Sequence, residues 1–256
     1  MTAFDYFDSV LCINLARRRD RWAEACTEFA LCGIVKYERV SAVDDSRGYR
    51  GCMASHLGVW QRIARGELGG RVLIFEDDFK FIVRHDLIEA GYGGATGEDA
   101  NVLRVFDSCP GVTPEERFGA MTKFIPEHWD LLYLGGSYVE PSRARMNNHI
   151  VRNTGMSCAH AYAMSRTYAS NVMQFFSREY PEDGCTEAPD TILRGLGRDP
   201  QVLSYTLSPR LFIQRESSKS DLTPRPAGFP RTMVDTFYEK IEEKIESGRN
   251  PLMGFW

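Results

Sequence analysis

The hydrophobic pattern divides the chain into short apolar runs and longer segments with helical periodicity. Apolar, β-rich runs predict five strands, at residues 9–15, 34–43, 71–75, 130–136 and 158–164. Helical spacing of apolar residues predicts helices after three of these strands, at residues 16–33, 52–67 and 166–176. Gly33 is expected to end the first helix, and Ser165 to cap the third.

This alternation of strands and helices favours an α/β fold with a mostly parallel central sheet and helices on its faces. Sheets of this kind bind ligands at the carboxyl ends of their strands. Functional side chains are therefore expected directly after the apolar runs.

Two segments depart from the alternation. Residues 89–128 are rich in Gly and Pro with mixed charge, and we interpret them as an excursion over the site. Residues 223–231 form a Pro-rich connector, and 232–248 carry the apolar stripe of an amphipathic helix. We expect one main domain at 1–222, with 223–256 as a connector and a helix packed on it.

Composition limits the classes of function. With 256 residues, 43% of them hydrophobic, the chain can bury a substantial core. A formal charge of −4 argues against binding nucleic acid through a general basic field. The seven scattered cysteines show no CxxC spacing, which is typical of reduced thiols. No signal peptide or membrane-spanning run is evident, so we expect a cytoplasmic protein.

The stretch "RVLIFEDDF" at 71–79 places three carboxylates at the end of a buried strand. If the extended backbone continues, Glu76 and Asp78 point one way and Asp77 the other. Two carboxylates about 5 Å apart repel by roughly 3 kcal/mol at an effective dielectric near 20. A divalent ion relieves this repulsion, and Mn²⁺ or Mg²⁺ suits two carboxylates completed by phosphates and water. The alternative is a solvated turn with helix-capping acids.

Five blocks resemble glycosyltransferase family 25, which includes bacterial lipopolysaccharide and lipooligosaccharide galactosyltransferases and collagen β-galactosyltransferases. They occur in the family's order: "VLCINLARRRDRW", "GCMASHLGVWQRI" leading into "VLIFEDDF", "WDLLYLGG", "AHAYAMSR" and "APDTIL". The resemblance covers residues 9–222. It implies a GT-A type, Rossmann-like nucleotide-sugar fold. It also implies inverting transfer of galactose or glucose from a UDP-sugar to a hydroxyl.

The resemblance assigns donor-binding roles to residues after the first two strands and on the second helix. Asn14 is expected to contact uracil or ribose, and Asp44 the ribose hydroxyls, although a turn-forming Asp44 is an alternative. Guanidinium groups at a helix N-terminus suit a diphosphate, although one of them can be a solvated surface charge. These candidates are Arg17, Arg18 and Arg21. The remaining candidates for donor binding or for ordering the site are Ser55, His56 and Asp77, with packing as the alternative for His56.

Inverting transfer requires a base that takes the proton of the acceptor hydroxyl. Asp190, directly after Pro189 at a predicted helix start, is our first candidate, with a helix-capping role as the alternative. Glu187 and Asp221 are the other candidates. Many GT-A enzymes supply a late histidine as a third metal ligand, whereas the last histidine here is His160. Either Asp221, another carboxylate or water completes the metal shell, or the metal is held weakly.

Two other classes of function stay open. A nucleotidyltransferase also combines such a sheet with a carboxylate metal site, but "INLARRRDR" lacks the glycines of its phosphate loop. A noncatalytic sugar-binding protein of the same fold is the other alternative. The acceptor could be a glycan, a lipid-linked sugar, a protein hydroxyl or a small molecule. The sequence does not indicate the oligomeric state.

Overall fold

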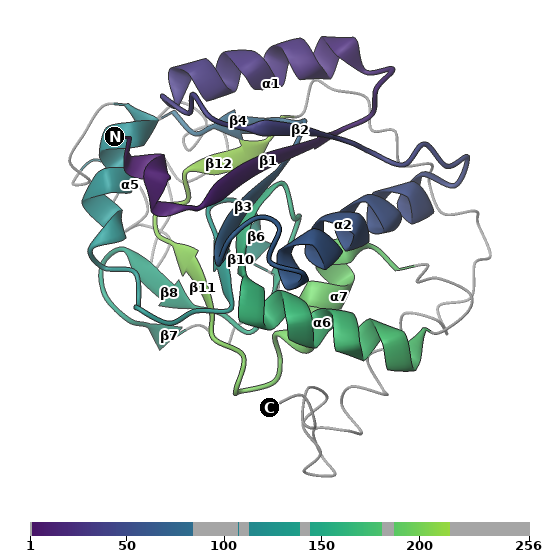
Figure 1. The fold of residues 1–256 in the computed structure, drawn as a ribbon. Helices are drawn as coiled ribbons and strands as arrows, with labels where there is room; N and C mark the ends of the chain where they lie inside the picture. Colours follow the sequence, from purple (N-terminus) through teal and green to yellow (C-terminus); the bar gives the residue numbers. More distant parts are fainter. Residues whose placement is uncertain (1, 84–106, 108–112, 139–143, 181–186, 216–256) are drawn as a thin grey trace.

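The computed structural model describes residues 2–83, 107, 113–138, 144–180 and 187–215, which form a mixed α/β fold (Figure 1). The helices of this part are the 3₁₀ turn η1 (Ala3–Tyr6), α1 (Arg19–Leu31), α2 (Gly48–Ala64), α5 (Pro114–Thr122), α6 (Arg166–Glu179) and α7 (Pro189–Leu196). The strands are β1 (Ser9–Asn14), β2 (Glu38–Ser41), β3 (Arg71–Glu76), β4 (Phe79–Phe81), β5 (Leu131–Tyr133), β6 (Ser137–Tyr138), β7 (Ala144–Arg145), β8 (Ile150–Arg152), β9 (Met156–Ser157), β10 (Ala161–Ser165), β11 (Ser204–Leu207) and β12 (Phe212–Gln214). None of these helices is long and apolar enough to cross a membrane.

The central sheet has eight strands in the order β2-β1-β3-β10-β5-β11-β8-β7 in the described part of the chain. Strand β1 is parallel to β2 and β3, and β5 is parallel to β11. Strand β10 is antiparallel to both β3 and β5, and β8 is antiparallel to β11 and β7. The predicted α/β class is confirmed. The parallel arrangement holds for β2, β1 and β3, and the sheet as a whole is mixed.

Alternating side chains of the strands supply one hydrophobic core on each face of the sheet. On β1, Leu11 and Ile13 belong to the core shared with α2, α6 and α7. Val10 and Cys12 belong to the core shared with α1 and α5. Figure 1 shows α1 on one side of the sheet and α2 and α6 on the other. The continuous apolar runs of the sequence follow from this burial on both faces.

Local signals fixed several helix ends as expected. Gly33 follows α1 with a φ of 67°, and the Ser165 hydroxyl accepts a hydrogen bond from the Tyr168 N–H at 3.1 Å. Helix α1 begins at Arg19, later than predicted, because Arg18 N–H closes a turn on the Leu15 carbonyl at 2.9 Å. Strand β2 is shorter than the predicted 34–43.

Other predictions fall on residues that the structure does not describe. Of the expected excursion at 89–128, the described part is residue 107 and residues 113–128, which include α5. The boundary at 222, the connector and the C-terminal helix lie outside the described residues.

Candidate functional site

A pocket of about 110 Å³ opens where β1, β2 and β3 end and α2 begins. Ile13 and Glu76 from the strand ends line it, together with Val43 after β2 and Gly48 at the start of α2. This is the carboxyl edge at which α/β sheets bind ligands. Eight of the candidates from the sequence line this pocket: Arg17, Arg21, Asp44, Ser55, His56, Glu76, Asp77 and Asp78.

The three carboxylates do not follow the alternation of a continued strand. Strand β3 ends at Glu76, and a turn over Asp77 and Asp78 leads into β4. Glu76 consequently faces α2, whereas Asp77 and Asp78 both contact Arg21 of α1. The pairing of Glu76 with Asp78 on one strand face was therefore wrong as local geometry, although both residues line the same pocket.

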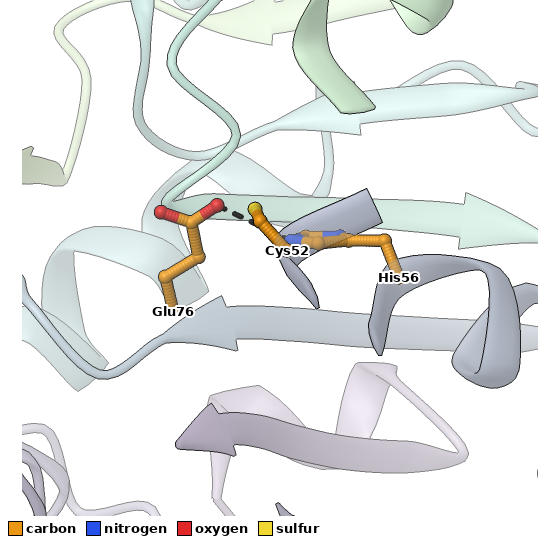
Figure 2. Close-up of side chains that lie close together, drawn as sticks. All are labelled: Cys52, His56 and Glu76. Carbon is orange, nitrogen blue, oxygen red and sulfur yellow. Dashed lines mark hydrogen bonds and ion pairs between the residues drawn. The ribbon is translucent and has the colours of Figure 1, made fainter. Parts of the chain in front are cut away.

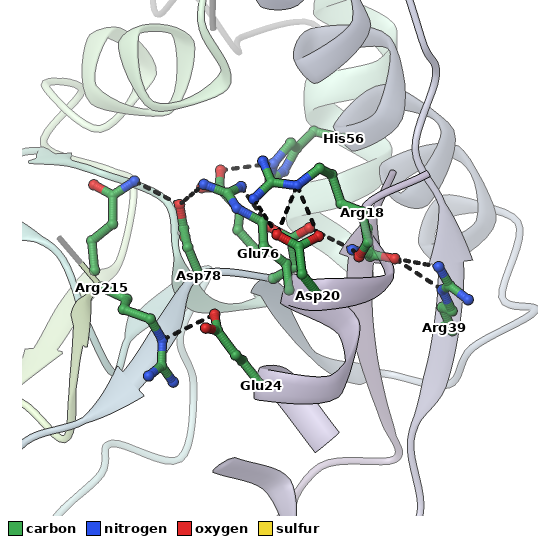
Figure 3. A network of polar contacts seen from close by, with 12 residues as sticks. Arg18, Asp20, Glu24, Arg39, His56, Glu76, Asp78 and Arg215 are labelled. Carbon is green, nitrogen blue, oxygen red and sulfur yellow. Dashed lines mark hydrogen bonds and ion pairs between the residues drawn. The ribbon is translucent and has the colours of Figure 1, made fainter. Parts of the chain in front are cut away.

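Asp77 is anchored inside the protein. Arg21 Nη1 lies 2.8 Å from its Oδ1, and Asn14 Nδ2 donates to its Oδ2 at 2.5 Å. Asn14 Oδ1 in turn accepts from Arg39 Nε at 3.0 Å (Figure 3). Burial raises the pKa of Asp77 against the lowering effect of Arg21. Asn14 is buried and supports Asp77, and it is not among the residues that line the pocket.

Asp78 retains one carboxylate oxygen without a partner. Gln214 Nε2 donates to Oδ2 at 2.9 Å, and Arg21 Nη2 lies 3.5 Å from the same oxygen. Oδ1 is buried and has no hydrogen-bond partner among the described residues. Burial, followed by the charge of Glu76, raises the pKa of Asp78 to about 6. A buried carboxylate oxygen without a donor suits a cation.

Gln214 was not predicted from the sequence. It belongs to β12, which pairs antiparallel with β4 and so brings residues far along the chain next to the carboxylates. The Arg215 N–H donates to the Asp78 carbonyl at 2.7 Å, and its side chain lies 3.5 Å from Glu24 (Figure 3). No local motif marks these two residues, since their role depends on a strand pairing over more than 130 residues.

A buried hydrogen-bonded chain orients Glu76. The Trp60 Nε1–H donates to the Tyr162 hydroxyl at 2.8 Å, and that hydroxyl lies 2.8 Å from His56 Nδ1. His56 Nε2 lies 3.2 Å from Glu76 Oε1. Since Trp60 can only donate, the Tyr162 hydrogen is available to Nδ1, and Nε2–H can donate to Glu76. Burial raises the pKa of Glu76, but the hydrogen bond from His56 and the nearby positive charges of His56, His160 and Arg21 together give a lowered pKa.

Cys52 joins this end of the site. It lies one helical turn before His56 on α2, and the ligand atoms of Cys52, His56 and Glu76 all lie within 4.8 Å of one another (Figure 2). Burial raises the pKa of the Cys52 thiol well above its ordinary value, with contributions from the charges of Glu76, Asp190 and Asp78. Cys52 was not predicted from the sequence, although its i, i+4 spacing to His56 could have indicated it.

The three arginine candidates occupy different environments. Arg21 is buried against Asp77. Arg17 lines the pocket, and its Nε lies 3.1 Å from Asp44 Oδ2, with both side chains at least half exposed. Arg18 Nη2 instead lies 2.7 Å from Asp20 and is not among the residues that line the pocket.

Ser55 holds the loop after β2 on α2. Its hydroxyl donates to the Gly51 carbonyl at 2.6 Å and accepts from the Val43 N–H at 2.8 Å. A Cβ on Gly51 would lie 2.4 Å from the Val43 carbonyl oxygen, so glycine permits this close approach. Ser55 therefore shapes the wall of the pocket.

Asp190 lies in the first turn of α7, and Ala188 occupies the N-cap position. Its Oδ2 accepts from the Cys158 N–H at 2.9 Å and its Oδ1 from the Thr191 N–H at 2.8 Å. The carboxylate thus ties the loop before β10 to α7, and its charge acts on Cys52 in the pocket. Glu187 is buried just before α7, and Asp221 lies outside the described residues.

No protein-family model matches the chain, and no curated protein matches it.

Proposed function

We propose that the protein is an inverting glycosyltransferase of GT-A type, which moves galactose or glucose from a UDP-sugar to a hydroxyl. One observation carries the proposal: the pocket at the ends of β1, β2 and β3 gathers five acidic side chains beside Arg17, Arg21 and the start of α2. The sequence blocks that resemble family 25 include the ends of β1 and β3 and most of α2, which contribute to this pocket. An ion with a diphosphate fits the combination of acidic and basic groups.

In this proposal Glu76 and Asp78 hold Mn²⁺ or Mg²⁺. The donor set fits a hard cation, because Asp78 Oδ1 is buried without a partner among the residues that the structure describes, and Glu76 lines the same pocket. The ion would neutralise charge on the leaving diphosphate. Arg17 would pair with the diphosphate, and Asp44 would accept hydrogen bonds from the ribose.

Asp190 is the proposed base. Its carboxylate would take the proton of the acceptor hydroxyl while that oxygen forms its bond to C1 of the sugar. The bond from C1 to the diphosphate oxygen breaks on the opposite face, and UDP leaves with the electron pair. The acceptor would be a glycan, a lipid-linked sugar or a protein hydroxyl.

The test measures UDP release from UDP-galactose, UDP-glucose and UDP-N-acetylglucosamine, with Mn²⁺ and with a chelator, in the presence of a crude glycan fraction. We expect Mn²⁺-dependent UDP release from one of the two hexose donors. Release of pyrophosphate from a nucleoside triphosphate and a sugar phosphate would instead indicate a nucleotidyltransferase. If the protein binds a UDP-sugar but gives no product from any donor, the proposed catalysis is contradicted. The noncatalytic sugar-binding function would then be favoured.

A further inference from the structure

Three side chains of different chemistry converge on the wall of the pocket nearest α2. Cys52 and His56 are four residues apart on α2 and therefore lie on one face of that helix. Glu76 reaches them from the end of β3 (Figure 2). Each residue offers one ligand atom, and these atoms lie within 4.8 Å of one another. A thiol, an imidazole and a carboxylate form a donor set different from the two carboxylates proposed for Mn²⁺.

The spacing fits a tetrahedral ion. Zinc bonds of about 2.0 to 2.3 Å to N, O and S place neighbouring ligand atoms roughly 3.4 to 3.6 Å apart. His56 Nε2 and Glu76 Oε1 are already 3.2 Å apart. The remaining separations are no more than 4.8 Å, and both Cys52 and Glu76 are only half-buried.

The imidazole is held for this role by its other nitrogen. His56 is only 1% exposed, and its Nδ1 lies 2.8 Å from the Tyr162 hydroxyl. That hydroxyl is itself fixed by the indole N–H of Trp60. Metal binding at Nε2 would require the other neutral tautomer, in which the single ring hydrogen is on Nδ1. Nδ1–H would then donate to the Tyr162 oxygen, the arrangement that orients histidine ligands in metal sites.

We propose that Cys52, His56 and Glu76 form a three-ligand site for Zn²⁺, with the fourth position open to the pocket. Thiolate and imidazole select a borderline-soft ion over Mn²⁺ or Mg²⁺. The site does not depend on the proposed glycosyl transfer. It does share Glu76 with the carboxylate pair, so Zn²⁺ in this site competes with the hard ion for that ligand.

Cobalt titration tests the site directly. The untagged chain is titrated with Co²⁺, which can occupy tetrahedral zinc sites. A thiolate ligand bound to Co²⁺ gives a charge-transfer band in the near ultraviolet. We expect one equivalent of Co²⁺ to produce this band, and Zn²⁺ to remove it. The band should be lost in Cys52→Ser and kept in Cys26→Ser, because Cys26 is a half-buried thiol of α1 that does not line the pocket. Equal bands in wild type and Cys52→Ser would overturn the proposal.

A second measurement uses the wild-type protein, so it tests the zinc site even if Cys52→Ser fails to fold. Alkylation of each cysteine is followed by peptide mass spectrometry with and without Zn²⁺. With free Zn²⁺ at about ten times its Kd, labelling of Cys52 should slow about tenfold. Labelling of Cys26 should be unchanged. A Cys52 labelling rate that does not respond to Zn²⁺ would exclude the site.

Discussion

Arg21 Nη1 lies 2.8 Å from Asp77 Oδ1, and the two side chains are only 10% and 8% exposed. This buried ion pair joins the start of α1 to the turn after β3. It places a positive charge where the sequence alone suggested only negative charge. Because the neighbouring Asp78 shares the same guanidinium, Arg21 organises the acidic edge of the pocket before any ligand binds.

Replacing Arg21 by Leu should destabilise the protein strongly, because it leaves the Asp77 carboxylate buried without its cation. Breaking one partner of a buried pair typically costs about 3 to 5 kcal/mol. Urea unfolding measures the loss. The double variant Arg21→Leu/Asp77→Asn should recover part of this loss. If its loss instead equals the sum of the losses in Arg21→Leu and Asp77→Asn, a direct pairing is contradicted. Arg18→Ala, which removes a pair with the exposed Asp20, is the control and should lower the midpoint much less than Arg21→Leu.

Arg17→Ala should weaken UDP binding about tenfold or more, since a charge-assisted hydrogen bond to a diphosphate contributes about 1.5 to 3 kcal/mol. Arg18→Ala should bind UDP as wild type does, because Arg18 lies against Asp20 and is not among the residues that line the pocket. Isothermal calorimetry gives both values of Kd. The reverse ranking of the two variants would place the nucleotide on the other side of this turn.

Asp78→Asn should abolish the part of UDP affinity that depends on Mn²⁺. The substitution keeps the size of the side chain and an acceptor for Gln214, but it removes the charge and the unpartnered carboxylate oxygen that would bind the ion. Calorimetry with and without Mn²⁺ measures the effect, and Asp20→Asn is the control for a carboxylate outside the pocket. An unchanged Mn²⁺ dependence in Asp78→Asn would remove Asp78 from the metal site.

Asp190→Asn should keep donor binding and lose turnover. Only one oxygen remains to accept from the Cys158 or Thr191 N–H, which costs about 1 kcal/mol of stability. Loss of a general base costs a further ~10² to 10⁴ in rate, so activity within about threefold of wild type would exclude Asp190 as the base. Glu187→Gln is the companion variant, and it should retain activity if Asp190 is the base.

Asp130 predicts a pH dependence of stability away from the pocket. Burial raises its pKa above the ordinary value of 3.8, although its Oδ2 accepts from the Leu203 N–H at 2.8 Å. A raised folded-state pKa means that the folded protein binds the proton more tightly than the unfolded chain. The favourable contribution is therefore full below the unfolded pKa and is lost as pH rises through the folded pKa. As pH rises through the folded pKa, Asp130→Asn should become more stable relative to wild type. The measurement is the Tm of the variant minus the Tm of wild type, taken at acidic and at neutral pH. If this Tm difference is the same at both pH values, the assignment to Asp130 is contradicted.

The sequence by itself determined the features that depend on neighbouring residues. Apolar runs located β1, β3 and β10, because continuous burial on both faces of a sheet leaves a readable pattern. Ser165 and Gly33 marked helix ends through local hydrogen bonding and a positive φ. The position of acidic residues after β3 also indicated the pocket edge, since strand ends and the following turns are adjacent in the chain.

Only the tertiary structure decided which side chains meet. Asp77 finds Arg21 across 56 residues, and Asp78 finds Gln214 across 136. Glu76 at the end of β3 contacts His56 of α2, whose other partner Tyr162 comes from a third element. Strand β10 runs antiparallel between β3 and β5. The hydrophobic pattern of a strand does not indicate whether it pairs in the parallel or the antiparallel direction. These relationships depend on strand order and long-range packing, which the periodicity of a single segment does not encode.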